Sequence, residues 1–142
     1  HHVGADAIRQ AIHLSLELSD RGAGAMLTLG DEESVVGLSD PPRKNSLRIG
    51  LMRLGEENLD PIISLAAQDG ATIFSSDGAV CRGMAFLRPP VAVDVEDEIG
   101  VGARHSTAVR VSKVTKALVI AVSSDGRITA YSRGAVKFKV MG

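Results

Sequence analysis

The sequence predicts an α/β fold, a single domain over residues 1–142 with a central mixed β-sheet flanked by helices. Two observations support this prediction. Segments with helical spacing of apolar residues alternate with short apolar segments bounded by glycine, which are typical of buried strands. Hydrophobic residues make up 44% of the 142 positions and charged residues 23%, so the chain has enough apolar surface to form a core.

The first third of the chain predicts a helix, a strand and a short second helix. The first helix spans residues 3–19, since its apolar residues recur every three or four positions. These residues are Ala5, Ile8, Ile12 and Leu16. Residues 23–29 lie between two glycines and predict a buried strand, and a short helix is expected after residues 31–34. Adjacent prolines within residues 38–45 predict an exposed loop.

The middle of the chain predicts a helix followed by a β-hairpin. The helix begins in the acidic, proline-containing segment 56–61 and continues to Gln68, with Ile62, Leu65 and Ala66 on its apolar face. Strands are expected at residues 71–74 and 79–87, because they flank the tight-turn sequence Ser75-Ser76-Asp77-Gly78. Cys81, within the second strand, is expected to be a small core residue.

The last third predicts a helix and three strands. A solvated acidic connection at residues 94–98 precedes Gly100-Val101-Gly102, which opens a helix running to Lys116. The strands are expected at residues 118–123, 128–132 and 135–140, with tight turns between them.

Composition excludes several classes of partner. The formal net charge is −1 and aromatic residues make up only 3%, so we expect no nucleic-acid partner. No apolar run approaches the length needed to cross a bilayer, and we expect no membrane contact by this domain. The single cysteine and the absence of a secretory segment at the start favour a reducing, cytoplasmic location.

Three Asp-Gly pairs occur in the chain. Those at Asp77 and Asp125 lie between expected strands, where Asp-Gly supplies the positive φ of a hairpin turn. Asp69 differs, because it joins the end of a helix to a strand. Its spacing alone still favours a structural turn.

The segment from Gly100 to Thr107 is a second candidate site. Glycines before a helix leave backbone N–H groups free at its positive end, and the guanidinium of Arg104 adds a planar set of donors, which together suit a phosphate. Helical spacing places Arg104 on the core-facing side. The alternative is a buried Arg104 paired with an acid from residues 94–98. His105 alone is typical of a core histidine, and no metal-ligand spacing of Cys or His occurs.

Taken together, the two segments resemble a known family. Asp69-Gly70-Ala71 follows a helix, a hairpin comes next, and Gly102-Ala103-Arg104-His105 opens a later helix. In this order and spacing the chain resembles, over nearly its whole length, the diadenylate cyclase domain family, in which an Asp-Gly-Ala and an Arg-His-Arg motif line one ATP site. The resemblance implies an enzyme that condenses two ATP into cyclic di-AMP and two pyrophosphates, across a homodimer whose protomers face each other with one ATP each.

The resemblance also implies roles for single residues. Asp69, Arg104 and His105 would be catalytic, with Asp69 beside the ribose 3′-hydroxyl and a Mg²⁺ or Mn²⁺ ion. The backbone of Leu87 would read adenine, and Arg104 and His105 would hold phosphate oxygens. The remaining ATP-binding positions would be Gly70, Ala71, Gly102, Ala103, Ser106, Thr107 and Ser123.

Some positions depart from the family pattern. Ser106 stands where many members have the second Arg, and Ser124-Asp125 stands where several have Ser-Glu-Glu, so Asp125 is a weaker candidate metal ligand. The loss of one charged phosphate contact costs about 1.5–3 kcal/mol, a ten- to hundredfold effect that slows an enzyme without abolishing activity. A domain that binds ATP or cyclic di-AMP as a sensor, and an α/β interaction domain without a nucleotide, are the alternatives.

Overall fold

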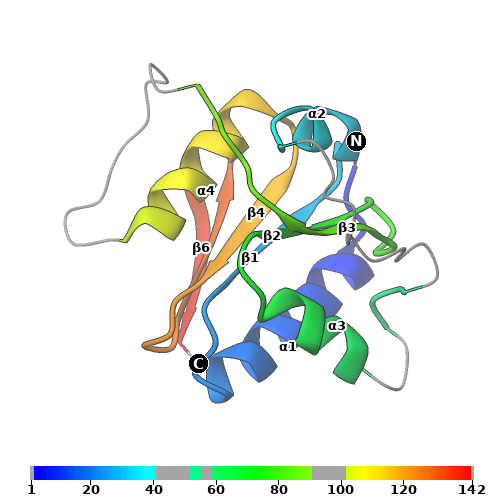
Figure 1. The fold of residues 1–142 in the computed structure, drawn as a ribbon, viewed down its shortest axis with the longest axis vertical. Coiled ribbons are helices and arrows are strands. Elements are labelled where there is room, and N and C mark those ends of the chain that lie inside the picture. The colour runs from blue at the N-terminus through cyan, green and yellow to red at the C-terminus, as the bar shows by residue number, and fades with distance from the viewer. Residues whose placement is uncertain (1, 41–51, 56–58, 91–101, 142) are drawn as a thin grey trace.

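A computed structural model describes residues 2–40, 52–55, 59–90 and 102–141, and it confirms the predicted α/β class with a mixed sheet (Figure 1). The elements in chain order are α1 (Ala5–Asp20), β1 (Ala25–Leu29), α2 (Glu32–Gly37), α3 (Asp60–Ala66), β2 (Ala71–Phe74), β3 (Val80–Ala85), α4 (Ala103–Val114), β4 (Leu118–Val122), β5 (Arg127–Ser132) and β6 (Ala135–Met141).

The six described strands lie in the order β3-β2-β1-β4-β5-β6. β1 and β2 pair in parallel and the other neighbours pair antiparallel. Met26 pairs with Ala71, and Ala25 pairs with Val122. The starts of β1 and β2 and the end of β4 therefore lie side by side, at one end of these central strands.

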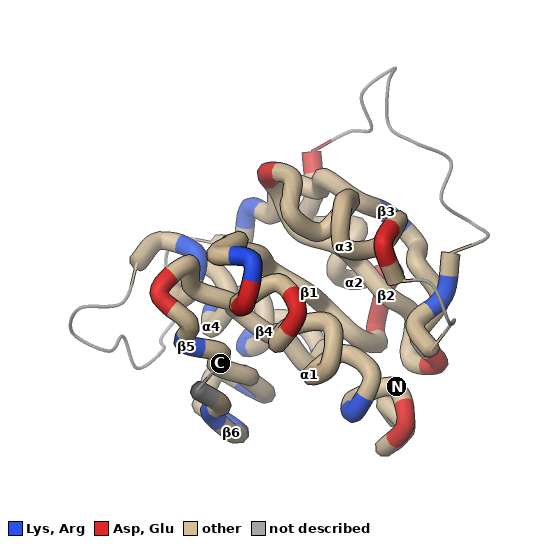
Figure 2. The backbone as a smooth tube through the Cα atoms, turned by 90° about the horizontal axis from the view of Figure 1, so that it is seen from below, with Lys and Arg blue, Asp and Glu red and all other residues tan. Residues whose placement is uncertain are grey.

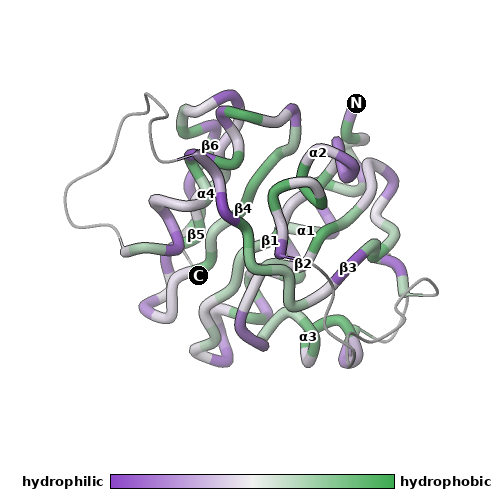
Figure 3. Tube along the Cα trace, turned by 45° about the horizontal axis from the view of Figure 1, so that its top comes forward, coloured by the Kyte–Doolittle hydropathy of each residue, from purple (hydrophilic) through white to green (hydrophobic). Residues whose placement is uncertain are grey.

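The helices cover both faces of the sheet. α1 and α3 pack with Leu27 and Ile120 on one face, whereas α2 and α4 pack with Met26 and Val119 on the other. Neighbouring strand residues thus point to opposite faces. All residues of β1 and β4 are buried, and Figure 3 shows their hydrophobic character along the centre of the fold. On the side seen in Figure 2, basic and acidic positions are interspersed.

The first helix buries a different stripe from the one predicted. Its buried apolar residues are Ala7, Ala11, Leu14 and Leu18. Ala5 is exposed, while Ile8 and Leu16 lie partly buried at the flank of the core. Both stripes have helical spacing of three or four residues, so spacing alone does not decide which of them faces the sheet.

The expectation for Cys81 was wrong, because its side chain is exposed. β3 is an edge strand, and only its first and last residues are buried. Its pairing with β2 is irregular, and Met84 adopts a positive φ of 55°. β3 also ends at Ala85, two residues earlier than expected, although Leu87 forms an isolated bridge with Ser39.

The hairpin after β2 and the three C-terminal strands are confirmed. The expected acidic connection at 94–98, the glycine at 100 and most of the loop at 38–45 lie outside the described residues, as does the expected helix start at 56–58. In the part of the chain that the structure describes, no helix has both the length and the apolar character needed to span a membrane.

Candidate functional site

A pocket lies between the starts of β1 and β2 and the first turns of α4. Its volume of about 320 Å³ is within the size range of small-molecule sites. It is lined by Met26, Gly70, Ala71, Ala85, Phe86, Leu87, Arg88, Arg104 and Thr107. The two segments that the sequence singled out therefore contribute to one pocket. Gly70 and Ala71 come from the start of β2, and Arg104 and Thr107 come from the first turns of α4.

Gly70 shapes the floor of this pocket. Its φ is +95°, and a β-carbon on it would lie 2.7 Å from the carbonyl carbon of Met84. Only glycine suits such a conformation with so close an approach of two backbone segments. Asp69 precedes it with an exposed side chain and does not itself line the pocket. Asp69 lies between α3 and β2, and its neighbour in the chain, Gly70, lines the pocket.

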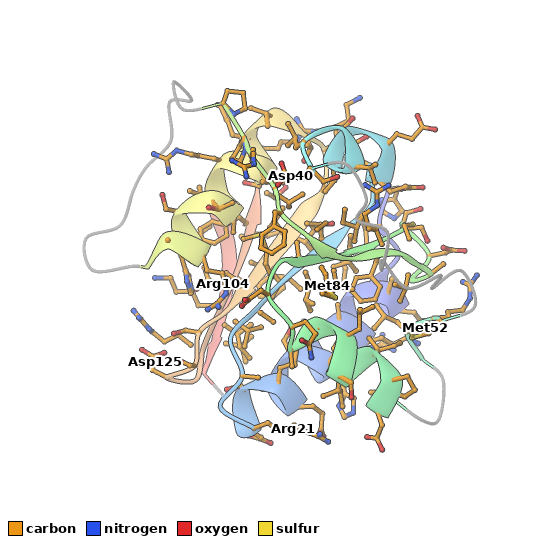
Figure 4. All side chains as sticks on the ribbon, in the orientation of Figure 1. Arg21, Asp40, Met52, Met84, Arg104 and Asp125 are labelled. Carbon is orange, nitrogen blue, oxygen red and sulfur yellow. The ribbon has the colours of Figure 1, made fainter. Side chains whose placement is uncertain are left out.

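Arg104 lines the same pocket from the first turn of α4 (Figure 4). A β-carbon on Gly24, just before β1, would lie 2.6 Å from the Cζ atom of Arg104. The guanidinium thus occupies space that a side chain at position 24 would fill. Its spacing predicted the core-facing side of the helix, and Arg104 does lie over Gly24, the residue before β1, but it is exposed. The alternative of a buried Arg104 is therefore wrong in its burial, and the acids at 94–98 that it invoked lie outside the described residues.

The next residues of α4 face elsewhere. His105 is only 4% exposed, and its ring meets that of Tyr131 edge-on, with 6.4 Å between ring centroids. Ser106 accepts hydrogen bonds from Nη1 of Arg110, at its hydroxyl and at its carbonyl, the latter at 3.1 Å. Gly102 and Ala103 are exposed at the start of the helix. None of these four lines the pocket, and their roles toward ATP remain predictions.

Ser123 and Asp125 lie in the turn after β4, at the end of the sheet where β1 begins. Asp125 accepts a hydrogen bond from Nε of Arg127 at 3.0 Å and another from the Arg127 backbone N–H at 3.2 Å. Hydrogen bonds from Arg127 and Ser123 lower the pKa of Asp125 to about 2. Its carboxylate is therefore ionised at neutral pH and paired within its own turn.

The backbone around Leu87 forms another wall. Residues 38–40 run antiparallel to residues 86–88, with hydrogen bonds from Asp40 N to Phe86 O at 3.1 Å and from Arg88 N to Leu38 O at 2.8 Å. In this arrangement Ser39 and Leu87 are a non-hydrogen-bonded pair, whose own N–H and C=O groups point away from the partner strand. The N–H and C=O of Leu87 therefore point away from residues 38–40, and Leu87 is one of the residues that line the pocket.

A divalent ion would find few protein ligands here. Among the described residues, no three His, Cys, Asp or Glu side chains form a cluster suited to a metal. Mg²⁺ commonly binds one or two carboxylates together with substrate phosphates and water. A single exposed carboxylate such as Asp69, next in sequence to a residue that lines the pocket, fits that mode of binding.

Sequence reasoning missed Gly24, Met26, Phe86 and Arg88. Each contributes to the site through a neighbour that is distant in the sequence, so no local sequence pattern indicates it.

A larger hollow of about 600 Å³ lies elsewhere, lined by His2, Val3, Ala5, Ile8, Lys116, Leu118, Ser132, Arg133 and Lys137. It contains none of the predicted site residues, so the smaller pocket is the candidate site.

Several known proteins are similar to this chain. Residues 14–136 match the family model described as DisA bacterial checkpoint controller nucleotide-binding. A diadenylate cyclase of Methanocaldococcus jannaschii is 30% identical over 139 residues, covering 93% of this chain and 44% of the relative. A diadenylate cyclase of Haloferax volcanii is 29% identical, covering 89% of this chain and 49% of the relative. The chain thus spans about half the length of these curated relatives.

Two solved structures share the fold. A hypothetical membrane spanning protein from Bacillus cereus aligns with a TM-score of 0.72 at 20% identity, over 96% of this chain and 64% of that one. DacA from Staphylococcus aureus, as an N166C/T172C double mutant, aligns with a TM-score of 0.60 at 20% identity, over 93% and 85% of the two chains.

Proposed function

This chain belongs to the DisA nucleotide-binding, or diadenylate cyclase, domain family, and on that basis we propose that it condenses two ATP molecules into cyclic di-AMP and two pyrophosphates. The observation that carries the proposal is the meeting of Gly70-Ala71 and Arg104 at one pocket beside the backbone of Leu87. These groups supply what a nucleotide needs, namely a close backbone approach for the sugar, a cation for phosphate and a polar edge for the base.

Leu87 selects adenine through its backbone. Its C=O accepts a hydrogen bond from the amino group of adenine, and its N–H donates to the neighbouring ring nitrogen. In the same orientation guanine presents a carbonyl and a ring N–H, which reverses both partners. Sites built for one such pattern reject the other strongly, because buried polar groups are then left without partners.

Arg104 holds phosphate oxygens at the other wall. Its planar guanidinium donates to two oxygens at once, and its place over Gly24 fixes where the charge lies. The hydroxyl of Thr107, one turn along α4, lies in the same lining. In phosphoryl transfer such positioning and charge neutralisation account for most of the catalysis.

Asp69 acts at the sugar. The carboxylate accepts the proton of the ribose 3′-hydroxyl as that oxygen attacks the α-phosphate of the second ATP. The new bond joins the 3′-oxygen to phosphorus, the bond to the β-phosphate breaks, and pyrophosphate leaves. A divalent ion, Mg²⁺ or Mn²⁺, would be held by Asp69 and the triphosphate, where it would favour the ionised hydroxyl and offset phosphate charge.

Two copies of the chain must face each other during turnover. One pocket of about 320 Å³ holds one nucleotide, whereas the reaction joins two. The nucleophile in each half-reaction therefore comes from the ATP of the opposing protomer. A monomer binds ATP and forms no product.

A nucleotide sensor is the second candidate. Asp125, which stands where several family members have an acid near the metal, is already paired with Arg127. Ser106, at the position of the second motif Arg, is hydrogen-bonded to Arg110. A chain that lacks both contributions still has a pocket that could retain a nucleotide without converting it.

Incubation with ATP and Mg²⁺ or Mn²⁺, followed by chromatography, separates these functions. A cyclase forms cyclic di-AMP and pyrophosphate. A sensor shows a higher melting temperature with ATP or cyclic di-AMP but forms no product. An interaction domain without a nucleotide site shows neither effect, and that outcome would refute both candidates.

A further inference from the structure

The segment that carries Leu87 leaves the sheet and is supported from the side by residues 38–40. Figure 1 shows the chain after β3 running between α2 and α4, beyond the start of β2. Two backbone hydrogen bonds to residues 38–40, Asp40 N to Phe86 O and Arg88 N to Leu38 O, continue the strand pairing here. The direction of the Leu87 N–H and C=O groups therefore depends on how firmly residues 38–40 hold this segment.

Two side-chain contacts fix residues 38–40 against it. Nε of Arg88 donates to Oδ1 of Asp40 at 2.7 Å, and Nη2 donates to Oδ2 at 3.1 Å. This two-point geometry fixes both the distance and the relative orientation of the two side chains. Next to this pair, Nη1 of Arg82 donates to Oγ of Ser39 at 2.9 Å. Asp40 lies opposite Phe86 and Arg88 lies opposite Leu38, so the ion pair crosses the Ser39–Leu87 bridge from one side to the other.

The ion pair also borders the pocket itself. Arg88 is one of the lining residues, and Asp40 lies on the α2 side of the segment, away from Arg104 (Figure 4). A change in the position of Arg88 would turn the preceding peptide groups, because Arg88 N–H is one of the two hydrogen bonds that define their orientation.

We propose that Asp40 is a positioning residue for base selection: by holding Arg88 at two points, it keeps the Leu87 N–H and C=O turned into the pocket and thereby sets the preference for adenine over guanine. This inference rests on the proposed function, since it assumes that the pocket takes a nucleotide. Asp40 touches neither base nor phosphate, and its effect passes through Arg88 and the backbone of residues 86–88.

The exposure of this ion pair indicates that it contributes little to folding stability. The side chain of Arg88 is 76% exposed and that of Asp40 is 38% exposed. Exposed ion pairs contribute little to folding stability. An Asp40→Asn variant should therefore fold normally, and its effect should show in nucleotide preference.

The chain offers a matched control in Asp77. Its carboxylate Oδ2 lies 3.1 Å from Nη1 of Arg53, and Arg53 forms another isolated bridge to the same hairpin, with Ala79. Neither residue lines the pocket. Asp77→Asn removes a carboxylate from another exposed arginine pair at a distance from the site, although Arg53 holds Asp77 at one carboxylate oxygen and Ser75 donates to the other.

The experiment measures the dissociation constants of ATP and GTP, and kcat and KM for ATP, in the wild type, Asp40→Asn, Asp40→Glu and Asp77→Asn. We expect Asp40→Asn to lower the ATP-over-GTP affinity ratio three- to tenfold and to raise KM for ATP, with kcat within twofold. Asp40→Glu should recover part of the ratio, and Asp77→Asn should keep it.

An unchanged ratio in folded Asp40→Asn, or the same loss in Asp77→Asn, would overturn the proposal. A wild type that binds ATP and GTP equally would also overturn it, even if cyclic di-AMP is formed. A wild type that prefers ATP but forms no product would refute the cyclase function alone. The role of Asp40 would still be tested by comparing the ATP-over-GTP affinity ratio of the wild type with that of Asp40→Asn.

Discussion

The guanidinium of Arg104 rests against Gly24, at a distance that a side chain at position 24 would not permit. A β-carbon there would lie 2.6 Å from Cζ of Arg104 and 2.8 Å from Nη2. The residue before β1 thus determines where the positive charge of α4 stands, although the two positions are 80 residues apart in the sequence.

Gly24→Ala is expected to displace Arg104 and weaken ATP binding. The methyl group meets the end of a flexible side chain, so the arginine moves while the fold remains. Loss of a charged hydrogen bond to phosphate corresponds to about 1.5–3 kcal/mol, or a ten- to hundredfold lower kcat/KM. Steady-state kinetics and thermal denaturation check this result. Gly37→Ala, with open space around it, is the control and should leave both unchanged.

Gly70→Ala is expected to disrupt the floor of the pocket. The substitution combines a positive φ with a contact of 2.7 Å to the Met84 backbone, which cannot rotate away. Gly22→Ala has a positive φ of 67° but no heavy atom within 4 Å, so it isolates the conformational cost. We expect Gly70→Ala to lower the free energy of unfolding by about 1–3 kcal/mol more than Gly22→Ala does. Equal losses in urea denaturation would show that the close approach has no energetic weight.

Asp69→Asn is expected to abolish product formation while retaining most ATP binding. The amide cannot accept the proton of the 3′-hydroxyl, and it is a poorer ligand for a divalent ion. Isothermal titration with ATP and chromatography of the products separate the two effects. Asp20→Asn, an exposed acid at the end of α1, is the control. A normal turnover number for Asp69→Asn would remove this residue from the mechanism.

His105→Ala is expected to lower the free energy of unfolding, and to lower activity only as a consequence of that loss. The ring is buried against Tyr131, and removal of a buried ring leaves a cavity that costs about 2–4 kcal/mol. The start of α4 should then shift and carry Arg104 with it, which raises KM for ATP. Urea denaturation and kinetics on the same samples test this order of effects. Full stability with lost turnover would instead support a direct contact between His105 and phosphate.

The sequence predicted the elements that positional patterns define, and it failed where burial depends on neighbours in space. The hairpin around Gly78 and the buried strand β4 follow from turn residues and a continuous apolar run. Cys81 appeared to be a core residue because it lies in an apolar strand, and only the sheet order shows that this strand is at an edge.

The same limit applies to the site. The spacing of α4 gave the direction of Arg104 but not the space above Gly24 that admits it. Asp40 and Arg88 are 48 residues apart, and no local pattern predicts that they pair. No local pattern predicts the burial of Asp31 either. Asp31 accepts a hydrogen bond from the backbone N–H of Lys116 at 2.8 Å, a contact between two distant connections.

The central claim is that two copies of this pocket, each with one ATP, face each other and join their nucleotides. The most direct test is the initial rate of cyclic di-AMP formation from saturating ATP and Mn²⁺ across a wide range of protein concentrations. If turnover needs a dimer, the rate rises with the square of protein concentration when monomers predominate and becomes proportional to concentration once dimers form. A rate per protomer that stays constant while sedimentation shows only monomers, or ATP consumption without cyclic di-AMP, would contradict it.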